Sequence, residues 1–593
     1  MYVLKEGRNY MIQVEKVSYG FPAKDLYKEV TFTLEEGQHC AFIGSNGTGK
    51  TTLIDMIMHP ENYLYDGKII RDENCRIGYV NQFSKADKQQ ERTVFEYLSE
   101  RFVQNQEETA KICAEMATTE ELDSLFERYQ ELLDQFQSMD GDHYEVNIRK
   151  QLKLVGMSYQ EETPIEKLSG GEYKLLQVMR EMLLQPNLLI MDEPDVFLDF
   201  ENLNGLCELI NSYKGTLLVI THNRYLLNHC FNKILHLENA DLQEFDGNYV
   251  DYNFALLQKK IELQEQAAAD QEEIARTEKM VDRMRTDATN ASIAALGRAL
   301  HAKETYLARL RARAIKAPFL DIRLPKIQLP EVETDPEGLC LSVWDYEVAF
   351  DDLLLENVCF ELHENEKVAI VGANGTGKTT MLREIFRNKN QAIDIKKGTK
   401  IGFLSQIHGE MLKESNTVYQ EFEAMGYASE EEVYALLADY CFEKDVLHQK
   451  IEQLSGGEQN LLQLAKIAVS DANLLLLDEP TSHLDTYSQI ALEKAISEYK
   501  GAVLMVSHDF YNIVNCADYI LFVDEKSIRR MRIRSFRKMI YENHFNKNYL
   551  ELEQKKKELE TRIASSLKDN DLKTAKRLCE QLEEVISQMS ACE

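Results

Sequence analysis

One short stretch that occurs twice decides the fold of this chain. It reads Gly44-Ser45-Asn46-Gly47-Thr48-Gly49-Lys50-Thr51-Thr52 and returns as Gly372-Ala373-Asn374-Gly375-Thr376-Gly377-Lys378-Thr379-Thr380. Each copy follows a short apolar run and precedes a helical pattern, which is the setting of a phosphate-binding loop. Glycines in such a loop let backbone N–H groups turn toward phosphate oxygens at a helix N-terminus. The two copies predict two phosphate-binding sites. In these sites Lys50 and Lys378 reach the β- and γ-phosphates, and the hydroxyls of Thr51 and Thr379 hold Mg²⁺.

Two carboxylates follow a second repeated run. Four apolar residues end in Asp192-Glu193 in the first copy and in Asp478-Glu479 in the second. Such a run is typical of a buried parallel strand whose C-terminal end lies at a ligand site. We expect Asp192 and Asp478 to organise the water shell of the metal. Glu193 and Glu479 would then polarise the attacking water as general bases.

Two further motifs repeat at the same interval as the carboxylates. Leu168-Ser169-Gly170-Gly171-Glu172 returns as Leu454-Ser455-Gly456-Gly457-Glu458, and Thr221-His222 returns as Ser507-His508. The first copy is about 38 residues longer between its early and middle motifs, from Gln82 to Leu168, than the second copy from Gln406 to Leu454. The added residues are rich in Glu and Leu, so we expect an extended helical subdomain at about 99–160.

Together these motifs resemble two ATPase domains of the ABC type. In that family the Ser and Gly of the LSGGE motif close over the nucleotide that the other domain holds. The resemblance implies one site made of Lys50, Thr51, Gln82, Asp192, Glu193 and His222, completed by Ser455 and Gly457. It implies a second site made of Lys378, Thr379, Gln406, Asp478, Glu479 and His508, completed by Ser169 and Gly171.

The same resemblance implies a role for each group. His222 and His508 join the two glutamates as catalytic residues. Gln82 and Gln406 join the two Thr and the two Asp as metal ligands, and the other loop residues through Thr52 and Thr380 bind ATP. ATP would pair the two domains within the chain, and hydrolysis would separate them.

Two features depart from the family pattern. The second copy runs Pro480-Thr481-Ser482-His483-Leu484-Asp485, close to the usual DEPTNHLD, whereas the first runs Pro194-Asp195-Val196-Phe197-Leu198-Asp199. We expect the contact of this first segment across the domain pair to be altered, and the two sites to hydrolyse ATP at different rates. The aromatic residue that stacks on adenine is also unsettled. Phe21 or Tyr19 in the first copy, and Phe350 or Tyr346 in the second, fit either that role or core packing.

The segment between the two copies resembles the ABC-F members of the family. Residues 242–252 are similar to the end of the first ATPase domain in ABC-F proteins. From Tyr252 to Arg285 there is no Gly or Pro, which predicts a long helix. The polar stretch 286–292 would break it, and a second helix would run to about Ile315 and end at Pro318. Further on, apolar residues at coiled-coil spacing predict a C-terminal helical hairpin that turns at 569–571.

The expected fold class is therefore α/β, with two P-loop ABC ATPase domains joined by a long α-helical hairpin linker and followed by a C-terminal helical extension. The expected boundaries are 1–250, 251–325, 326–544 and 545–593.

The linker has a charge opposite to that of the whole chain. Residues 277–326 carry eleven Lys and Arg against five Asp and Glu, whereas the chain has a net charge of −32. Such a local excess of positive charge indicates a polyanion partner. A second basic run, with Arg529, Arg530, Arg532, Arg534, Arg537 and Lys538, is either another RNA contact or an edge strand of the ATPase domain.

Composition limits the compartment. No stretch reaches the roughly 18 apolar residues that a membrane span needs, and residues 1–10 lack the apolar region of a signal peptide. The eleven cysteines never form a CxxC pair, which favours reduced thiols over a disulfide framework or a zinc site. We expect a cytoplasmic protein with no membrane segment of its own.

Three functional hypotheses follow. The resemblance to ABC-F proteins implies an ATPase that binds the ribosome in its ATP-closed form, with the linker reaching toward the P-site tRNA, rRNA and the peptidyl transferase centre. Such proteins act in antibiotic target protection or in translation. The alternative is the ATPase motor of a transporter with a separate membrane partner. A clamp on DNA is the third hypothesis, but such proteins separate their motifs by much longer coiled coils.

Overall fold

The computed structural model describes residues 10–21, 24–81, 91–118, 122–196, 198–291, 301–309, 324–332, 335, 338–349, 353–541, 549–569 and 571–590. The chain divides into two compact units. One holds residues 1–248 and 323–537, and the other holds residues 249–322 and 538–593. Within the first unit we call residues 10–248 the first half and residues 324–537 the second half. Across the described ranges, no helix is both long enough and apolar enough to cross a membrane.

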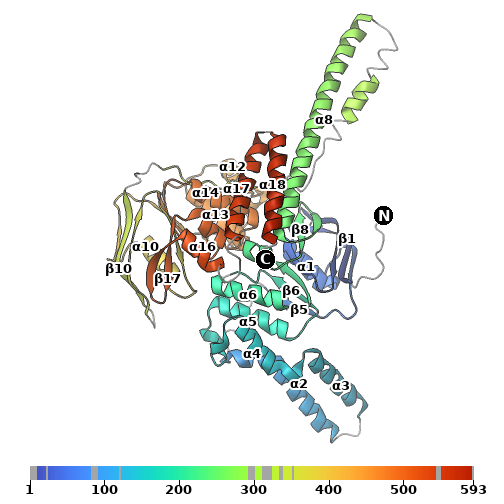
Figure 1. Ribbon diagram of the computed structural model, residues 1–593, viewed down its shortest axis with the longest axis vertical. Coiled ribbons are helices and arrows are strands. Elements are labelled where there is room, and N and C mark those ends of the chain that lie inside the picture. Colours follow the sequence, from blue (N-terminus) through green and yellow to red (C-terminus); the bar gives the residue numbers. More distant parts are fainter. Residues whose placement is uncertain are drawn as a thin grey trace. The chain divides into compact units, whose positions relative to one another are not determined.

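Each half is built on a six-stranded sheet, and the two sheets have the same strand order. The ribbon diagram draws their strands as arrows (Figure 1). In the first half the order is β5 (Ile77–Val80), β6 (Leu188–Asp192), β7 (Thr216–Ile220), β3 (His39–Ile43), β8 (Lys233–Glu238) and β9 (Asp241–Asp246). In the second half it is β14 (Ile401–Leu404), β15 (Leu474–Asp478), β16 (Ala502–Val506), β12 (Lys367–Val371), β17 (Tyr519–Asp524) and β18 (Ser527–Arg532). All neighbours are parallel except the last pair of each sheet. The apolar runs before each Asp-Glu pair are the fully buried strands β6 and β15, as parallel strands require.

An antiparallel sheet accompanies each parallel sheet. The first is β2 (Lys24–Glu35), β1 (Tyr10–Phe21) and β4 (Asp66–Arg71), and the second is β11 (Leu353–His363), β10 (Leu339–Ala349) and β13 (Ile393–Ile395). The main core of each half lies between its two sheets and the helix that follows its Gly-rich loop. Phe32, Phe42 and Leu53 bring these three elements together in the first half, each fully buried. Burying a side chain of this size stabilises the fold by about 1.5–3 kcal/mol.

The helices of the two halves also correspond. Those of the first half are α1 (Lys50–Met58), α5 (Gly170–Leu183), α6 (Phe200–Ser212) and α7 (Arg224–His229). Their counterparts are α10 (Lys378–Arg387), α13 (Gly456–Ala468), α14 (Thr486–Glu498) and α15 (Phe510–Cys516), after which α16 (Ile533–Tyr541) is added. The largest difference lies before α5 and α13. The first half inserts α2 (Val94–Met116), α3 (Asp123–Ser138) and α4 (Tyr144–Leu154) there, whereas the second has only α11 (Val418–Glu423) and α12 (Glu430–Ala438).

The second compact unit is helical. It contains α8 (Tyr249–Ala291), a helical segment at 301–309, α17 (Tyr549–Lys568) and α18 (Leu572–Ser590). Hydrogen bonds join α8 to the segment at 301–309, from Arg285 to Glu304 at 2.8 Å and from the Tyr306 hydroxyl to Glu273 at 2.7 Å. The expected break at residues 286–292 is wrong, because α8 continues to Ala291. That stretch contains no Gly or Pro, so its polar residues lower helix propensity without ending the helix.

The C-terminal hairpin packs through one apolar stripe on each helix. Leu559 and Ile563 on α17 are buried, as are the residues of α18 at matching spacing, Leu578, Leu582, Val585 and Met589. An ion pair of 2.8 Å also joins Lys576 of α18 to Glu265 of α8. The expected class, two α/β halves with a helical linker and a helical C-terminal extension, is confirmed.

Candidate nucleotide sites

The first Gly-rich loop is held in a shape that only glycine allows. Gly49 is the residue before α1 and has a φ of 97°. A Cβ there would lie 2.7 Å from the hydroxyl of Tyr27, and that hydroxyl donates to the Gly49 carbonyl at 2.5 Å. Tyr27 of strand β2 therefore fixes the conformation of the loop at the start of α1, where backbone N–H groups can bind a phosphate.

The lysine and threonine of this loop lie where the sequence places them. The Lys50 ammonium donates to the carbonyl oxygens of Gly44 at 2.9 Å and Ser45 at 3.0 Å, under the turn of the loop. Burial lowers the pKa of Lys50. The Thr51 hydroxyl donates to Asp192 Oδ2 at 3.0 Å, and burial raises the pKa of Asp192 to about 6. The loop and the end of β6 thus form one polar cluster.

The second loop repeats this arrangement. Lys378 donates to the carbonyl oxygens of Gly372 at 2.8 Å and Ala373 at 2.5 Å, and Thr379 donates to Asp478 Oδ1 at 2.9 Å. Burial raises the pKa of Asp478 to about 6. The other oxygen of Asp478 is buried without a hydrogen-bond partner among the described residues. A hydroxyl and a carboxylate with a spare oxygen are the donors that Mg²⁺ and its waters prefer, so these residues fit that ion.

Both candidate general bases sit on strained backbone. Glu193 has a φ of 46° and Glu479 a φ of 49°, a backbone region that residues other than glycine rarely adopt. In each case the residue directly follows a buried strand, and its N–H donates to the next strand at 2.9 Å, to Ile220 or to Val506. Strain of this kind, imposed by the surrounding sheet, commonly marks a functional position.

The two halves meet through the segments that follow these glutamates. Asp485 caps α14 by accepting from the Ser488 N–H, and its other oxygen accepts from the Asn46 N–H of the first loop at 3.1 Å. Asp199 caps α6 in the same way, and its other oxygen accepts from the Asn374 N–H of the second loop at 2.9 Å. Each half therefore touches the loop of the other half. The altered residues 195–197 leave this contact of Asp199 in place, which the sequence analysis did not expect.

A cavity of about 720 Å³ joins the first loop to the LSGGE motif of the second half. Its lining includes Lys50 and Thr51 together with Ser455 and Gly457. A Cβ at Gly457 would lie 2.3 Å from the side-chain nitrogen Nδ2 of Asn46 and 2.4 Å from the backbone carbonyl oxygen of His483. Glycine is therefore required where the two halves approach.

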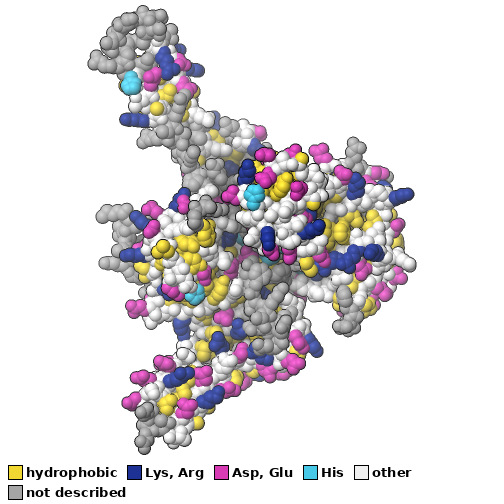
Figure 2. Space-filling view, turned by 180° about the vertical axis from the view of Figure 1, so that it is seen from behind, with side chains coloured by type: hydrophobic (Ala, Val, Ile, Leu, Met, Phe, Trp, Pro, Cys, Tyr) yellow, Lys and Arg dark blue, Asp and Glu magenta, His cyan; other side chains and the backbone are white. Residues whose placement is uncertain are grey.

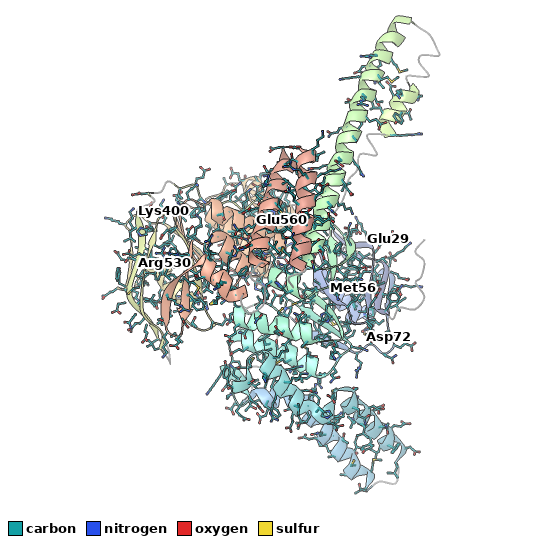
Figure 3. The ribbon with its side chains drawn as sticks, viewed as in Figure 1. Glu29, Met56, Asp72, Lys400, Arg530 and Glu560 are labelled. Atoms are coloured by element: carbon teal, nitrogen blue, oxygen red, sulfur yellow. The ribbon has the colours of Figure 1, made fainter. Side chains whose placement is uncertain are left out.

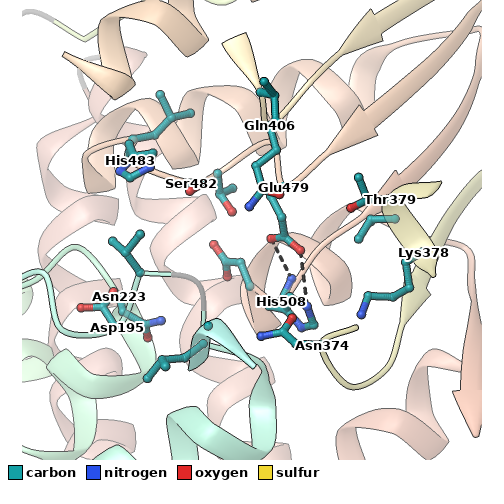
Figure 4. Close-up of a pocket in the computed structure, with 18 of the residues that line it drawn as sticks. Asp195, Asn223, Asn374, Lys378, Thr379, Gln406, Glu479, Ser482, His483 and His508 are labelled. Atoms are coloured by element: carbon teal, nitrogen blue, oxygen red, sulfur yellow. Dashed lines mark hydrogen bonds and ion pairs between the residues drawn. The ribbon is translucent and has the colours of Figure 1, made fainter. Parts of the chain in front are cut away.

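A second cavity, of about 850 Å³, lies at the second loop (Figure 4). It is lined by Lys378, Thr379 and Glu479, and by Gly170 from the first half. Gly171 lies beside it, because a Cβ there would be 3.4 Å from the Asn374 amide nitrogen. Ser169 is not among the described residues that line this cavity; its hydroxyl caps α5 by accepting from Glu172. The LSGGE motif of the first half thus contributes only Gly170 to the lining of the second cavity, which the first half lines mainly through residues near Glu193 and His222.

The glutamates have different histidine partners. Glu479 accepts from the His508 N–H at 3.2 Å, and the His508 ring lies 3.6 Å from it (Figure 4). Glu193 instead has the ring of His483, from the second half, at 3.8 Å. The pKa of Glu193 is lowered, because its contact with His483 and the positive charge of Lys50 outweigh burial. Burial next to Asp478 raises the pKa of Glu479 to about 8.

The two predicted catalytic histidines, His222 and His508, are largely buried and neutral. Burial and the charge of Lys50 lower the pKa of His222 to about 4, and burial and Lys378 lower that of His508 to about 3. Both ring nitrogens of His222, and Nδ1 of His508, lack hydrogen-bond partners among the described residues. Both histidines line the second cavity, although the sequence assigned His222 to the first site, and these nitrogens can bond to groups that enter it.

The aromatic and glutamine residues predicted for the sites have different positions in the structure. Phe21 lines the first cavity and is 56% exposed, so it is free to stack on a base, whereas Tyr19 packs against Tyr27 and Tyr63. Tyr346 is fully buried in the core, because it lies on the inner face of β10, and it cannot stack on adenine. Gln406 lines both cavities. Phe350 and Gln82 lie outside the described residues.

Sequence reasoning missed two residues at the junction of the halves. His483 stood in a quoted motif but was given no role. Arg224, the second residue after His222, forms ion pairs with Glu493 and with Asp509 of the second half, the latter at 3.3 Å. Its guanidinium lies 4.6 Å from the centre of the Tyr511 ring. No local pattern marks Arg224, because its partners are more than 260 residues away.

Comparison with known proteins places this arrangement in a large group. A family model described as ABC transporter matches residues 27–196 and 355–482, just over half of the chain, and a second model of the same description matches residues 235–298. The uncharacterized ABC transporter ATP-binding protein YfmM of Bacillus subtilis is 28% identical, over 84% of this chain and 96% of the relative. ABC transporter F family member 5 of Arabidopsis thaliana is 28% identical, over 87% of this chain and 75% of the relative.

Among solved structures, an archaeal complex of the ribosomal stalk protein aP1 and the ribosome recycling factor aABCE1 aligns with a TM-score of 0.54. It has 18% identity, and the alignment covers 90% of this chain and 93% of that chain. At this identity the likeness is one of fold.

Proposed function

Because the chain belongs to the ABC transporter family and has the tandem ATP-binding domains of its ABC-F members, we propose that it is a cytoplasmic ATPase that binds the ribosome in an ATP-closed form and leaves after hydrolysis. The observation that carries this proposal is the pair of contacts across the halves, Asp485 to the first loop and Asp199 to the second. ATP at either site would contact residues of both halves. Its binding would therefore favour the closed arrangement of the halves, and loss of the γ-phosphate would favour the open one.

The chemistry follows from the polar cluster at each loop. The loop N–H groups and Lys50 or Lys378 would bind the phosphates, and the dipole of α1 or α10 would favour their charge. Thr51 with Asp192, and Thr379 with Asp478 and Gln406, would hold Mg²⁺ with its waters, and Gln82 is proposed for the first site as well. When bound, this ion neutralises charge on the phosphate oxygens. Glu193 and Glu479 would accept a proton from the attacking water. His222 and His508 would donate toward the γ-phosphate.

Ribosome binding is supported by charge. Residues 277–326 carry an excess of six positive charges in a chain of −32, and α8 extends over 43 residues. A segment with this excess of positive charge suits an RNA partner, whose phosphates release counterions on binding. We propose that this linker reaches toward P-site tRNA and the peptidyl transferase centre. Its role there would be antibiotic target protection or regulation of translation.

The transporter motor is the second candidate. The family description itself favours it. The basic segment 277–326 weighs against it, since a motor that docks on a membrane subunit does not need such an excess of positive charge. The two candidates differ in the partner that ATP recruits, so one binding experiment separates them.

The test is co-sedimentation with 70S ribosomes with and without ATP. The Glu193→Gln/Glu479→Gln protein keeps both loops but lacks both bases, so it should bind ATP, stay closed and pellet with ribosomes only when ATP is present. The matched control, Lys50→Ala/Lys378→Ala, keeps the linker but loses phosphate contacts and should stay in the supernatant. If the first protein binds ATP and still fails to pellet, the ribosomal proposal is wrong and a membrane partner should be sought.

A further inference from the structure

The final strands of the two parallel sheets occupy equivalent positions but carry opposite charge. Each is the last, antiparallel strand of its sheet. In the first half β9 reads Asp-Leu-Gln-Glu-Phe-Asp, with three acidic residues and no basic one. In the second half β18 reads Ser-Ile-Arg-Arg-Met-Arg, with three arginines and no acidic residue. The fold therefore accommodates either charge at this edge.

A small cavity lies on one face of β18. It has a volume of about 320 Å³ and is lined by Trp344 of β10, by Tyr519 and Leu521 of β17, and by Ile528 and Arg530 of β18. Trp344 is 59% exposed. Because side chains alternate along a strand, Arg532 lies on the same face of β18 as Ile528 and Arg530, whereas Arg529 lies on the other. Arg530, Arg532 and the indole therefore share one face.

Arg530 is held in place before any ligand arrives. Its guanidinium carbon lies 3.5 Å from the centre of the Tyr519 ring, and the Tyr519 hydroxyl donates to the Glu361 carbonyl at 3.2 Å. A guanidinium stacked on a fixed ring keeps its N–H groups free along its edge, which suits phosphate. Figure 3 shows Arg530 on the second half. In Figure 2, Lys and Arg side chains run beside hydrophobic ones at the right of the view, where this half lies.

The charged residues that line the cavity favour some anionic ligands over others. Two carboxylates, Glu361 and Glu366, also line it, and they would repel a bare phosphate. A ligand with phosphates on the outside and a planar, N–H-bearing group on the inside fits better. Exposed indoles bind unstacked bases in this way, and carboxylates accept hydrogen bonds from base amino groups.

We propose that this face of the second half is a binding site for single-stranded RNA, with phosphates on Arg530 and Arg532 and a base stacked on Trp344. The site is separate from the linker and needs neither ATP nor the ribosome, so it goes beyond the proposed function and can stand or fall independently of it.

Trp344 is the single tryptophan of the chain, so its fluorescence reports on this site alone. We would titrate the protein, free of ribosomes and nucleotide, with a single-stranded RNA of about 12 nucleotides, within the usual site size of such surfaces. The emission of Trp344 should be quenched to saturation. Arg530→Gln/Arg532→Gln should weaken this binding about tenfold or more at low salt, and the salt slope should fall by about 1.4 for two lost phosphate contacts.

The matched control is Lys413→Gln/Lys444→Gln, which removes two exposed cations from the segment between β14 and α13 of the same half. It should leave the quenching curve nearly unchanged. Arg529→Gln, on the opposite face of the strand, should have a smaller effect than Arg530→Gln. Inorganic polyphosphate should leave the emission unaltered.

Three results would overturn the proposal. RNA could bind in a filter assay without changing Trp344 emission. The Arg530/Arg532 variant could match the lysine control. Polyphosphate could quench as strongly as RNA, which would mean that no base is involved.

Discussion

The two nucleotide sites have matching loops but different partners from across the molecule. In both, a lysine lies under the loop, and a threonine donates to the aspartate at the end of a buried strand. They differ at the glutamates, since Glu193 is contacted by His483 of the other half whereas Glu479 is contacted by His508 of its own. The position equivalent to His483 in the first half is Phe197. The asymmetry therefore comes from the segments that cross between the halves and not from the loops.

A second difference lies beside Glu193 on the same segment. Asp195 is half-buried and accepts from the Thr221 hydroxyl at 2.7 Å, and burial of its carboxylate raises its pKa to about 6. The equivalent residue in the second half is the neutral Thr481. Lys174 accompanies Asp195 in the first half, where the second half has Asn460, whose amide donates to Ser482 at 2.6 Å. The first half thus has two charged residues at positions where the second half has two neutral ones.

The largest expected effect comes from removing the bases one at a time. Glu193→Gln should lower steady-state ATP turnover by about 10²- to 10⁴-fold, the usual contribution of a general base. Glu479→Gln should retain most of the turnover, because the site that His483 supports still works. Phosphate release at saturating ATP measures both. Equal losses, or a greater loss in Glu479→Gln, would show that the sites are equivalent or ranked the other way.

Much of each site could be predicted from the sequence because its motifs are local. The loop, the Thr–Asp pair and the glutamate at the end of a strand depend on residues whose types and order already specify strand, turn and helix. Local sequence also indicated the inserted helices α2 to α4 through their Glu- and Leu-rich composition. The end of α8 was placed wrongly because polar residues weaken a helix without stopping it.

Contacts between the halves could not be predicted in this way. His483 and Arg224 act on residues 260 to 290 positions distant, and their partners are set by how two folded surfaces fit together. Tyr346 was a candidate for adenine stacking by spacing alone, and only the register of β10 places it in the core. The contact of Asp199 survived three changed neighbours because it depends on the helix cap that fixes its side chain.

The segments that follow His222 and His508 also differ between the two halves. Arg224 in the first half is replaced by Phe510 in the second. Its side chain is 10% exposed and its partner Glu493 is 9% exposed. Arg224→Met should cost about 3–5 kcal/mol of stability, because it leaves two carboxylates of the second half near the interface without their cation. Denaturant unfolding measures the loss.

Arg149→Met is the matched control for this variant. Arg149 also pairs with two glutamates, but its side chain is 53% exposed, so its loss should cost at most about 1 kcal/mol. Similar costs for the two variants would contradict a special role for Arg224 in joining the halves.

The central claim is that His483 acts on Glu193 in the other half, and one cycle of variants tests it most directly. His483→Phe keeps the backbone contact, since Asn46 bonds to the His483 carbonyl. In the Glu479→Gln protein, where the Glu193 site turns over, this change should slow phosphate release about tenfold, the order of one lost polar contact with a charged group. In the Glu193→Gln protein it should leave the residual rate unchanged. Equal slowing in both proteins would contradict the claim, because His483 would then be acting within its own half.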